Sequence, residues 1–158
     1  MDAVVVFTLD AQRFALYLST VHRVVRAVAI ARLPKAPSIV LGIINVHGVI
    51  VPVVDVRSRF GLLPRDLALT DKFIIAHAGE LDVAVVADAV LDVADCPAEV
   101  LADPEDVVPG TSYVTAIAKL QGGITLIHDL ETFLSLDEQR VLTDALVARS
   151  KSPSDATQ

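Results

Sequence analysis

The segment Leu41-Gly-Ile-Ile-Asn-Val-His-Gly-Val-Ile-Val-Pro-Val-Val-Asp-Val-Arg-Ser-Arg-Phe-Gly61 decides how the rest of the chain is interpreted. It contains no charged residue before Asp55, and such a run must first be distinguished from a membrane span. Asn45, the His47-Gly48 pair and Pro52 divide it into two apolar stretches of strand length that are rich in Val and Ile. The segment therefore predicts a buried β-hairpin with a two-residue turn.

The composition indicates a globular protein. The chain has 158 residues, of which 53% are hydrophobic and only 4% aromatic, and its mean hydropathy is +0.58. An apolar, Val-rich sequence of this kind predicts short strands that are buried on both faces. The first residues lack the features of a signal peptide, and Cys96 is the single cysteine, so we expect a cytoplasmic protein without an intrachain disulfide.

The net charge of −7 argues against nucleic acid as a partner, because a phosphate backbone is bound by clustered Lys and Arg. The only dense basic segment is His22–Arg26. Two interpretations of this segment stay open: solvated strand edges, or a local basic patch for a protein partner.

An internal repeat relates the two halves of the chain. Two shifts, of 74 and 69 positions, align apolar and turn residues in the same order, and their difference is explained by a loop insertion. The aligned residues include Gly48 with Gly122, Val53 with Ile127, Asp55 with Asp129, and Ala15-Leu16-Tyr17 with Ala84-Val85-Val86. We interpret this agreement as a duplication.

Each half is predicted to contain five strands and short helices. In the first half these are Val4–Leu9, Phe14–Leu18, a helical turn near Ser19–Val25, a strand at Ala27–Leu33, the hairpin Ile39–Val54 and a helix at Val56–Phe60. In the second half they are Lys72–Ala78, Leu81–Val86, Val90–Ala94, Val114–Gln121, Ile124–His128 and a helix at Leu130–Leu134. Short antiparallel connections predict an all-β fold of two small closed barrels, since closure removes exposed strand edges.

The expected boundaries follow from this plan. The first barrel covers about residues 1–65, the second about residues 66–135, and a terminal helix about residues 137–148. Residues 149–158 are polar and are expected to form a disordered tail.

The pattern Gly-x-x-Asn-x-x-Gly-x-x-x-Pro-x-x-Asp runs without a gap from Gly42 to Asp55. Val5-Val-Phe-Thr-Leu-Asp10 and Phe14-Ala-Leu-Tyr-Leu18 precede it, and Arg57 and Phe60-Gly61 follow it. Together these motifs resemble the CheW domain of chemotaxis coupling proteins over about residues 3–148. The resemblance implies one CheW-like domain over residues 1–148, with two SH3-like five-stranded β-barrels around a shared core.

The resemblance also implies a function and partners. The protein would be a non-enzymatic adaptor, monomeric when free, that joins the cytoplasmic tip of methyl-accepting chemoreceptors to the regulatory domain of a CheA-type histidine kinase. It would not insert into the membrane itself. The receptor would bind in a groove with apolar anchors and a polar rim. By resemblance, the groove and rim residues are Leu18, Val21, Arg23, Val24, Gly42, Ile44, Asn45, His47, Gly48 and Val86. Taken singly, the aliphatic residues among them are equally compatible with ordinary core positions.

Two residues depart from the family pattern. Common members have Glu where Arg23 stands and Arg where His47 stands. Arg23 reverses a charge, and His47 replaces a permanent cation with a group that is mostly neutral near pH 7. Because rim charges set partner choice, these departures predict an altered receptor preference and an alternative chemosensory array. Neutral variation at tolerant surface positions remains the competing interpretation.

No catalytic site, metal site or cofactor is predicted. The four histidines lie 25 to 51 residues apart, without the spacing of a metal motif, and no nucleophile elbow, phosphate loop or dinucleotide fingerprint occurs. Asp55 and Asp129 precede short helices, where carboxylates cap backbone N–H groups. Two other functions stay open: a small-ligand sensory domain that uses the cleft between the barrels, and a decoy that binds the kinase but no receptor.

Overall fold

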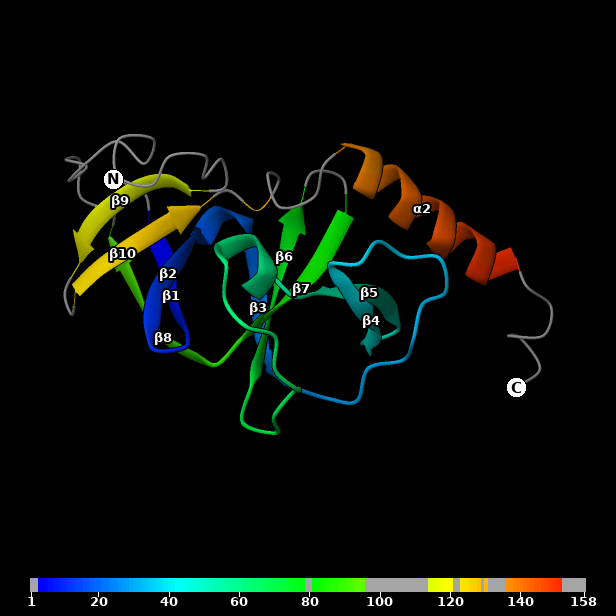
Figure 1. The fold of residues 1–158 in the computed structure, drawn as a ribbon, viewed down its shortest axis with the longest axis horizontal. Coiled ribbons are helices and arrows are strands. Elements are labelled where there is room, and N and C mark those ends of the chain that lie inside the picture. The colour runs from blue at the N-terminus through cyan, green and yellow to red at the C-terminus, as the bar shows by residue number, and fades with distance from the viewer. Residues whose placement is uncertain are drawn as a thin grey trace.

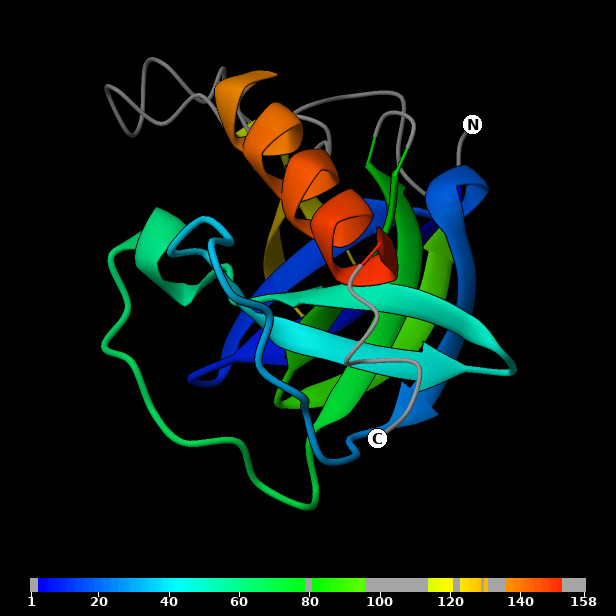
Figure 2. The same ribbon diagram turned by 90° about the vertical axis from the view of Figure 1, so that its right-hand side faces the viewer.

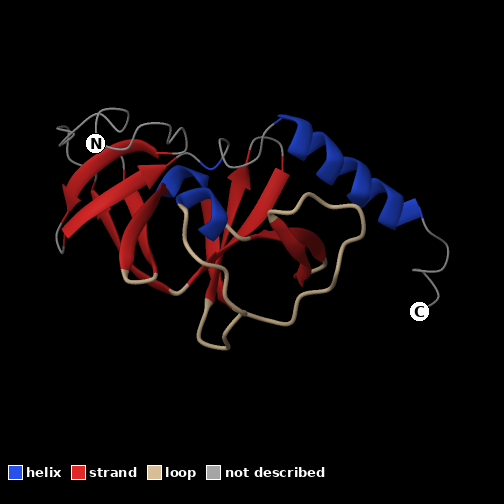
Figure 3. Ribbon diagram, viewed as in Figure 1, coloured by secondary structure: helices blue, strands red, loops and turns tan. Residues whose placement is uncertain are grey.

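The computed structural model describes residues 3–78, 81–95, 114–120, 123–128, 130 and 136–151 (Figures 1 and 3). Strands dominate the described chain, and one long helix follows them. In chain order the elements are β1 (Ala3–Leu9), β2 (Gln12–Tyr17), η1 (Leu18–Thr20), β3 (Val21–Arg26), β4 (Val40–Val46), β5 (Val49–Val54), η2 (Arg57–Phe60), β6 (Lys72–Ala78), β7 (Leu81–Ala87), β8 (Ala89–Asp95), β9 (Val114–Leu120), β10 (Gly123–His128) and α2 (Leu136–Lys151).

The strands form two five-stranded sheets of the same design. The first sheet has the order β8-β1-β2-β10-β9, and the second sheet has the order β3-β6-β7-β5-β4. In each sheet a central antiparallel hairpin pairs in parallel with the second strand of another hairpin. Ala15 lies opposite Ile127 in the first sheet, and Ala84 lies opposite Val53 in the second. The shift of 69 positions aligns Ala15 with Ala84, and the shift of 74 aligns Val53 with Ile127. Residues that the shifts align therefore occupy equivalent places in the two sheets, and the predicted repeat is confirmed.

Each sheet takes strands from both halves of the chain. The first sheet combines β1 and β2 with β8, β9 and β10, whereas the second combines β3, β4 and β5 with β6 and β7 (Figure 1). The expected division of the strands into residues 1–65 and 66–135 therefore does not match the hydrogen-bonded sheets. The difference arises because β3 leaves the hairpin that precedes it and pairs with β6, and β8 makes the equivalent exchange by pairing with β1.

The prediction of two SH3-like five-stranded units is confirmed, but their closure is not. Among the described strands, no ladder joins β8 to β9 or β3 to β4, so both sheets remain open at their edges. The edges of the second sheet nevertheless approach each other, because side chains from β3, β4 and β5 line one pocket. We call the gap between the edge strands β3 and β4 the open seam of the second sheet, and a pocket lies beside it.

The core has three parts, and strand alternation distributes the residues among them. In β7, Val83 and Val85 enter the core that both sheets share, whereas Ala84 and Val86 face the separate core of the second sheet. Phe14 of β2 enters the shared core, whereas its neighbour Ala15 faces the separate core of the first sheet. Because successive side chains of a strand point to opposite faces, these central strands are buried on both sides, as the composition predicts.

Helix α2 lies over the second sheet, and in the view of Figure 2 its C-terminal end lies next to the β4–β5 hairpin. Its Leu142 and Ala145 side chains are buried in the shared core. The helix continues to Lys151, past the expected end at residue 148, so the first residues of the expected disordered tail are helical. Residues 152–158 lie outside the described part of the chain. No helix within the described residues has the length and apolar character needed to cross a membrane.

Several local predictions need correction. The predicted helical turn near Ser19–Val25 is limited to η1, and the chain from Val21 onward is strand β3. The predicted strand at Ala27–Leu33 contributes only an isolated bridge from Ala31 to Ile43. The predicted helix at Leu130–Leu134 and the aspartate at position 129 fall almost entirely outside the described residues. The short helix η2 and its end at Gly61, which has a φ of 72°, agree with the prediction.

Candidate functional site

A pocket of about 260 Å³ lies at the open seam of the second sheet. Its wall combines basic side chains with aliphatic side chains of the β4–β5 hairpin. The lining residues are His22, Arg23, Val46, His47, Val49, Val51, Ile75 and Asp82. Because β3 and β4 are opposite edges of the sheet, the pocket exists only where the sheet curls far enough to bring its edges together.

The turn of the β4–β5 hairpin forms one side of this pocket. His47 and Gly48 have φ values of 51° and 88°, and two consecutive positive φ values define the turn type that suits a tight hairpin. The Asn45 side chain stabilises the turn, because its Oδ1 accepts a 2.7 Å hydrogen bond from the backbone N–H of Gly48. The predicted two-residue turn is confirmed, and it projects from the sheet at exposed positions.

Strand β3 forms the opposite side of the pocket. A register irregularity separates Val21, which lies opposite Ala76, from Arg23, which lies opposite Ile75. The extra residue in β3 is His22, and both His22 and Arg23 are exposed. Bulges of this kind redirect side chains at sheet edges. The bulge lies at His22 and Arg23, and the side chains of these two consecutive residues both line the pocket.

Comparisons with known proteins agree with the fold and identify the family. The model of the CheW-like domain family matches residues 3–138. The chain belongs to this family.

Individual relatives extend over most of the chain. It is 28% identical over 147 residues to "Chemotaxis protein CheW" of Klebsiella aerogenes, covering 92% of this chain and 87% of the relative. It is 23% identical over 141 residues to "Chemotaxis protein CheW" of Bacillus subtilis, covering 88% and 90%. The crystal structure of the scaffolding protein TtCheW from Thermoanaerobacter tengcongensis is similar with a TM-score of 0.75 and 30% identity, over 87% of this chain and 90% of that one.

The residues expected to form a CheW-type groove are divided between the surface and the core. Ile44 and Val86 are 4% and 7% exposed, and both belong to the separate core of the second sheet. Val21 is partly buried against the shared core. Leu18 and Val24 are each 40% exposed and therefore accessible to a partner. Of the aliphatic residues in the expected groove, only these last two are exposed.

Gly42 has a structural role in the second sheet. Its φ is 156°, and an added Cβ would overlap the carbonyl oxygen of Ala31 and the side chain of Ile30. The backbones meet closely here because Ala31 and Ile43 exchange two hydrogen bonds, of 2.9 and 2.7 Å. Only glycine permits this approach.

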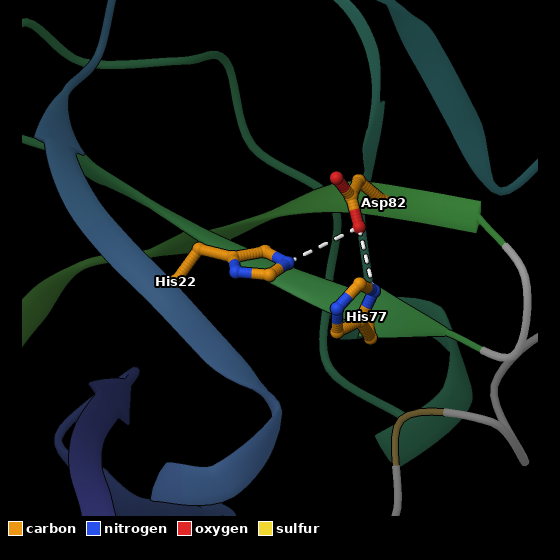
Figure 4. A group of neighbouring side chains, drawn as sticks. All are labelled: His22, His77 and Asp82. Carbon is orange, nitrogen blue, oxygen red and sulfur yellow. Dashed lines mark hydrogen bonds and ion pairs between the residues drawn. The ribbon is translucent and has the colours of Figure 1, made fainter.

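Two groups of polar side chains come together in the structure although the sequence did not predict it. The first group consists of His22, His77 and Asp82, whose partly exposed side chains come from β3, β6 and β7 and lie close together (Figure 4). The predicted turn between β6 and β7 implies that His77 and Asp82 are cross-strand neighbours, a signal that was present in the sequence. His22 joins them only because β3 pairs with β6 across the two halves, and this pairing has no local sequence signal.

The second group is an ion-pair network around Arg57, which is only 3% exposed. Arg57 donates hydrogen bonds to Asp10 Oδ1 at 2.7 Å and to Asp88 Oδ1 at 2.6 Å. Arg65 bridges Asp88 and the buried Asp71. The network joins the β1–β2 turn, η2 and the loop that leads to β6, so it connects elements of both sheets.

The charge state of Asp88 reflects this network. Burial alone would raise the pKa of its carboxyl group, but the backbone N–H of Asp10 and the guanidinium groups of Arg57 and Arg65 outweigh burial and lower it. The sequence predicts Asp55 as the N-cap, but it lies one residue before the N-cap Val56 of η2. Its Oδ1 still accepts a 3.0 Å hydrogen bond from the N–H of Arg57, the first residue of that helix.

His128 has the structural role that its sequence context favours. It is fully buried, and its ring packs against Phe7, Phe14 and Phe60 at centroid distances of 5.7, 6.1 and 5.3 Å. Burial lowers the pKa of His128 to about 3, because the apolar surroundings disfavour the imidazolium ion. His128 is therefore a neutral part of the core at physiological pH.

Proposed function

We propose that this protein is a non-enzymatic signalling adaptor that couples chemoreceptors to a CheA-type histidine kinase. The observation that carries the proposal is the match of the CheW-like domain family to nearly the whole chain. Relatives named as chemotaxis protein CheW, and a solved relative named as a scaffolding protein, support the same role. The adaptor would act in the cytoplasm and reach the membrane only through its partners.

The receptor-binding surface in this proposal is the pocket together with β3. Leu18 and Val24 supply exposed apolar anchors, and Arg23 and His47 supply a polar rim. An amphipathic helical hairpin from a receptor tip would place its apolar residues on the anchors and its charges against the rim. The buried residues Ile44 and Val86 would support this surface from below, and Gly42, Asn45 and Gly48 would hold the hairpin in shape.

The size of the pocket weighs against a small-molecule function. Sites for metabolites or drug-sized ligands usually enclose about 300–1,000 Å³ and bury most of the ligand. The pocket at the seam has about 260 Å³ and several polar side chains in its wall. It is a better match for part of a protein interface than for a metabolite site.

The test combines binding with kinase activity. The protein is mixed with the regulatory domain of a CheA-type kinase from the same organism and analysed by gel filtration, and kinase autophosphorylation is then measured with and without receptor. An adaptor gives a co-eluting complex and receptor-dependent kinase control. A complex without receptor-dependent control of the kinase would favour the decoy function over the adaptor function. A failure to bind the kinase, with a small molecule retained on purification, would favour the sensory domain.

A further inference from the structure

Two histidines and an aspartate from three adjacent strands converge on one point of the surface. His77 of β6 lies directly opposite Asp82 of β7 in the antiparallel ladder. His22 comes from the neighbouring strand β3, at the position where the bulge interrupts the pairing with β6. Residues from positions far apart in the sequence are therefore held side by side on a rigid sheet, not on a mobile loop.

The side chains point at a shared atom, as Figure 4 shows. Asp82 Oδ1 lies 2.7 Å from His77 Nδ1 and 3.3 Å from His22 Nε2. The two imidazole rings meet edge to face with centroids 4.1 Å apart. One potential ligand atom from each residue lies within 4.8 Å of the others. Zinc binds nitrogen and oxygen at about 2.0–2.2 Å, so the ligand atoms of a tetrahedral ion lie roughly 3.3 Å apart. Small side-chain rotations would bring the three groups to this spacing.

The donor set has the chemistry of a transition-metal site. Imidazole nitrogen suits Zn²⁺, Ni²⁺ and Cu²⁺, and a carboxylate is a common third ligand. Histidine is the commonest metal ligand in proteins, because a ring nitrogen of its imidazole can donate a lone pair. The alternative is a hydrogen-bonded surface cluster that binds no metal, and a metal titration distinguishes the two.

The cluster is also accessible. The side chains of His22, His77 and Asp82 are 40%, 51% and 39% exposed, so an ion reaches them from solvent without unfolding of the sheet. Three protein ligands leave at least one coordination position for water or for a donor from another molecule. His22 and Asp82 also line the pocket at the seam, so an ion bound here would lie at the pocket wall.

We propose that His22, His77 and Asp82 form a binding site for a divalent transition-metal ion such as Zn²⁺. The site crosslinks β3, β6 and β7, of which β3 is an edge strand of the second sheet. The proposal does not depend on the adaptor function, because metal binding is measured on the protein alone.

The test is isothermal titration of ZnCl₂ into chelator-treated full-length protein, with Tm measured in parallel. The expected result is one ion per chain, a higher Tm with Zn²⁺, and at least tenfold weaker binding in each of His22→Gln, His77→Gln and Asp82→Asn. His47→Gln is the matched control, because His47 lines the same pocket but lies outside the cluster, and it should retain wild-type affinity. These exposed substitutions are checked for folding by circular dichroism. Absence of Zn²⁺ binding, or binding that the three substitutions leave unchanged, would overturn the proposal.

Discussion

Arg23 and His47 line the same pocket, although they come from opposite sides of the open seam in the second sheet. The sequence identified both as departures from the family pattern, and the structure brings the two departures together. A substitution at Arg23 therefore changes the charge of the pocket next to His47, and a substitution at His47 changes it next to Arg23. Because both changes in charge lie in one pocket, they would act together on the choice of a partner that binds there.

The first prediction concerns this pair. Replacing Arg23→Glu and His47→Arg together introduces the residues that the resemblance assigns to common family members, and affinity for a generic chemoreceptor tip should increase several-fold, equivalent to about 1 kcal/mol. Surface plasmon resonance at two salt concentrations would measure the gain in affinity and how much of that gain salt removes. Lys72→Glu, at a partly exposed position that does not line the pocket, serves as the control. Equal affinities of the double variant and the wild type would show that the two positions tolerate neutral change.

A second prediction concerns the close backbone approach at Gly42. Gly42→Ala places a Cβ against the carbonyl of Ala31 and should lower the free energy of unfolding by about 2–3 kcal/mol, since both overpacking and backbone strain act there. Gly61→Ala is the matched control: Gly61 also has a positive φ, but an added Cβ meets no atom within 4 Å. Its cost should be only about 1 kcal/mol, the strain of the left-handed conformation. Urea denaturation of the two variants measures both values, and similar losses would contradict the steric explanation.

A third prediction concerns the network around Arg57. Arg57→Met leaves Asp10 and Asp88 without their shared buried cation and should destabilise the fold by about 2–3 kcal/mol, below the full range for a buried pair because Asp10 is half exposed. Arg59→Met removes an ion pair with Glu138 whose arginine side chain is 24% exposed, against 4% for Arg57, and it should cost less than about 1 kcal/mol. Thermal and urea unfolding would compare the two, and an Arg57→Met loss no larger than that of Arg59→Met would refute the structural role.

A fourth prediction concerns pH. Because the pKa of His128 is lowered to about 3, the unfolded chain binds a proton below pH 6.5 that the folded protein does not. The contribution of neutral His128 to the free energy of unfolding is therefore complete above pH 6.5. The free energy of unfolding then decreases as the pH falls toward 3, by up to about 1.4 kcal/mol per pH unit. The lowered pKa of Asp88 acts in the same direction, but only below its ordinary value of 3.8.

Urea denaturation between pH 6.5 and pH 4.5 isolates the contribution of His128. The His128→Leu variant lacks the titrating group, so its free energy of unfolding should change less steeply across this interval than that of the wild type. The comparison uses slopes, and any constant loss of packing energy in the variant cancels. Parallel slopes would mean that His128 is protonated in the folded state.

Local features of the fold could be predicted from the sequence, whereas pairings between distant segments could not. The His47-Gly48 turn and the end of η2 at Gly61 follow from short-range backbone preferences, and the structure confirms them. The burial of Arg57 depends on Asp10 and Asp88, which reach it only after the sheets have formed. The same reason explains why the spacing of the histidines in the sequence indicates no metal motif, although the rings of His22 and His77 are neighbours in space.

The expected groove illustrates a second limit. Ile44 and Val86 each lie in a strand, and the sequence alone does not say which face of the strand carries the side chain. The curl of the second sheet turns both side chains toward its interior. Leu18 and Val24 have the same chemical character but remain outside. Hydrophobic side chains alone therefore do not distinguish a partner surface from a core.

The exchange of strands between the sheets makes this molecule a single-chain counterpart of a domain-swapped dimer. Each half of the duplication contributes strands to a sheet that the other half must complete, as the pairing of β8 with β1 and of β3 with β6 shows. A chain cut in the loop between η2 and β6 would leave two fragments that each lack part of both sheets. Such fragments should remain unfolded alone and fold only when mixed, with a stability that rises with their concentration. The duplicated copies are mutually obligate, and neither can be removed while the other persists as a folded unit.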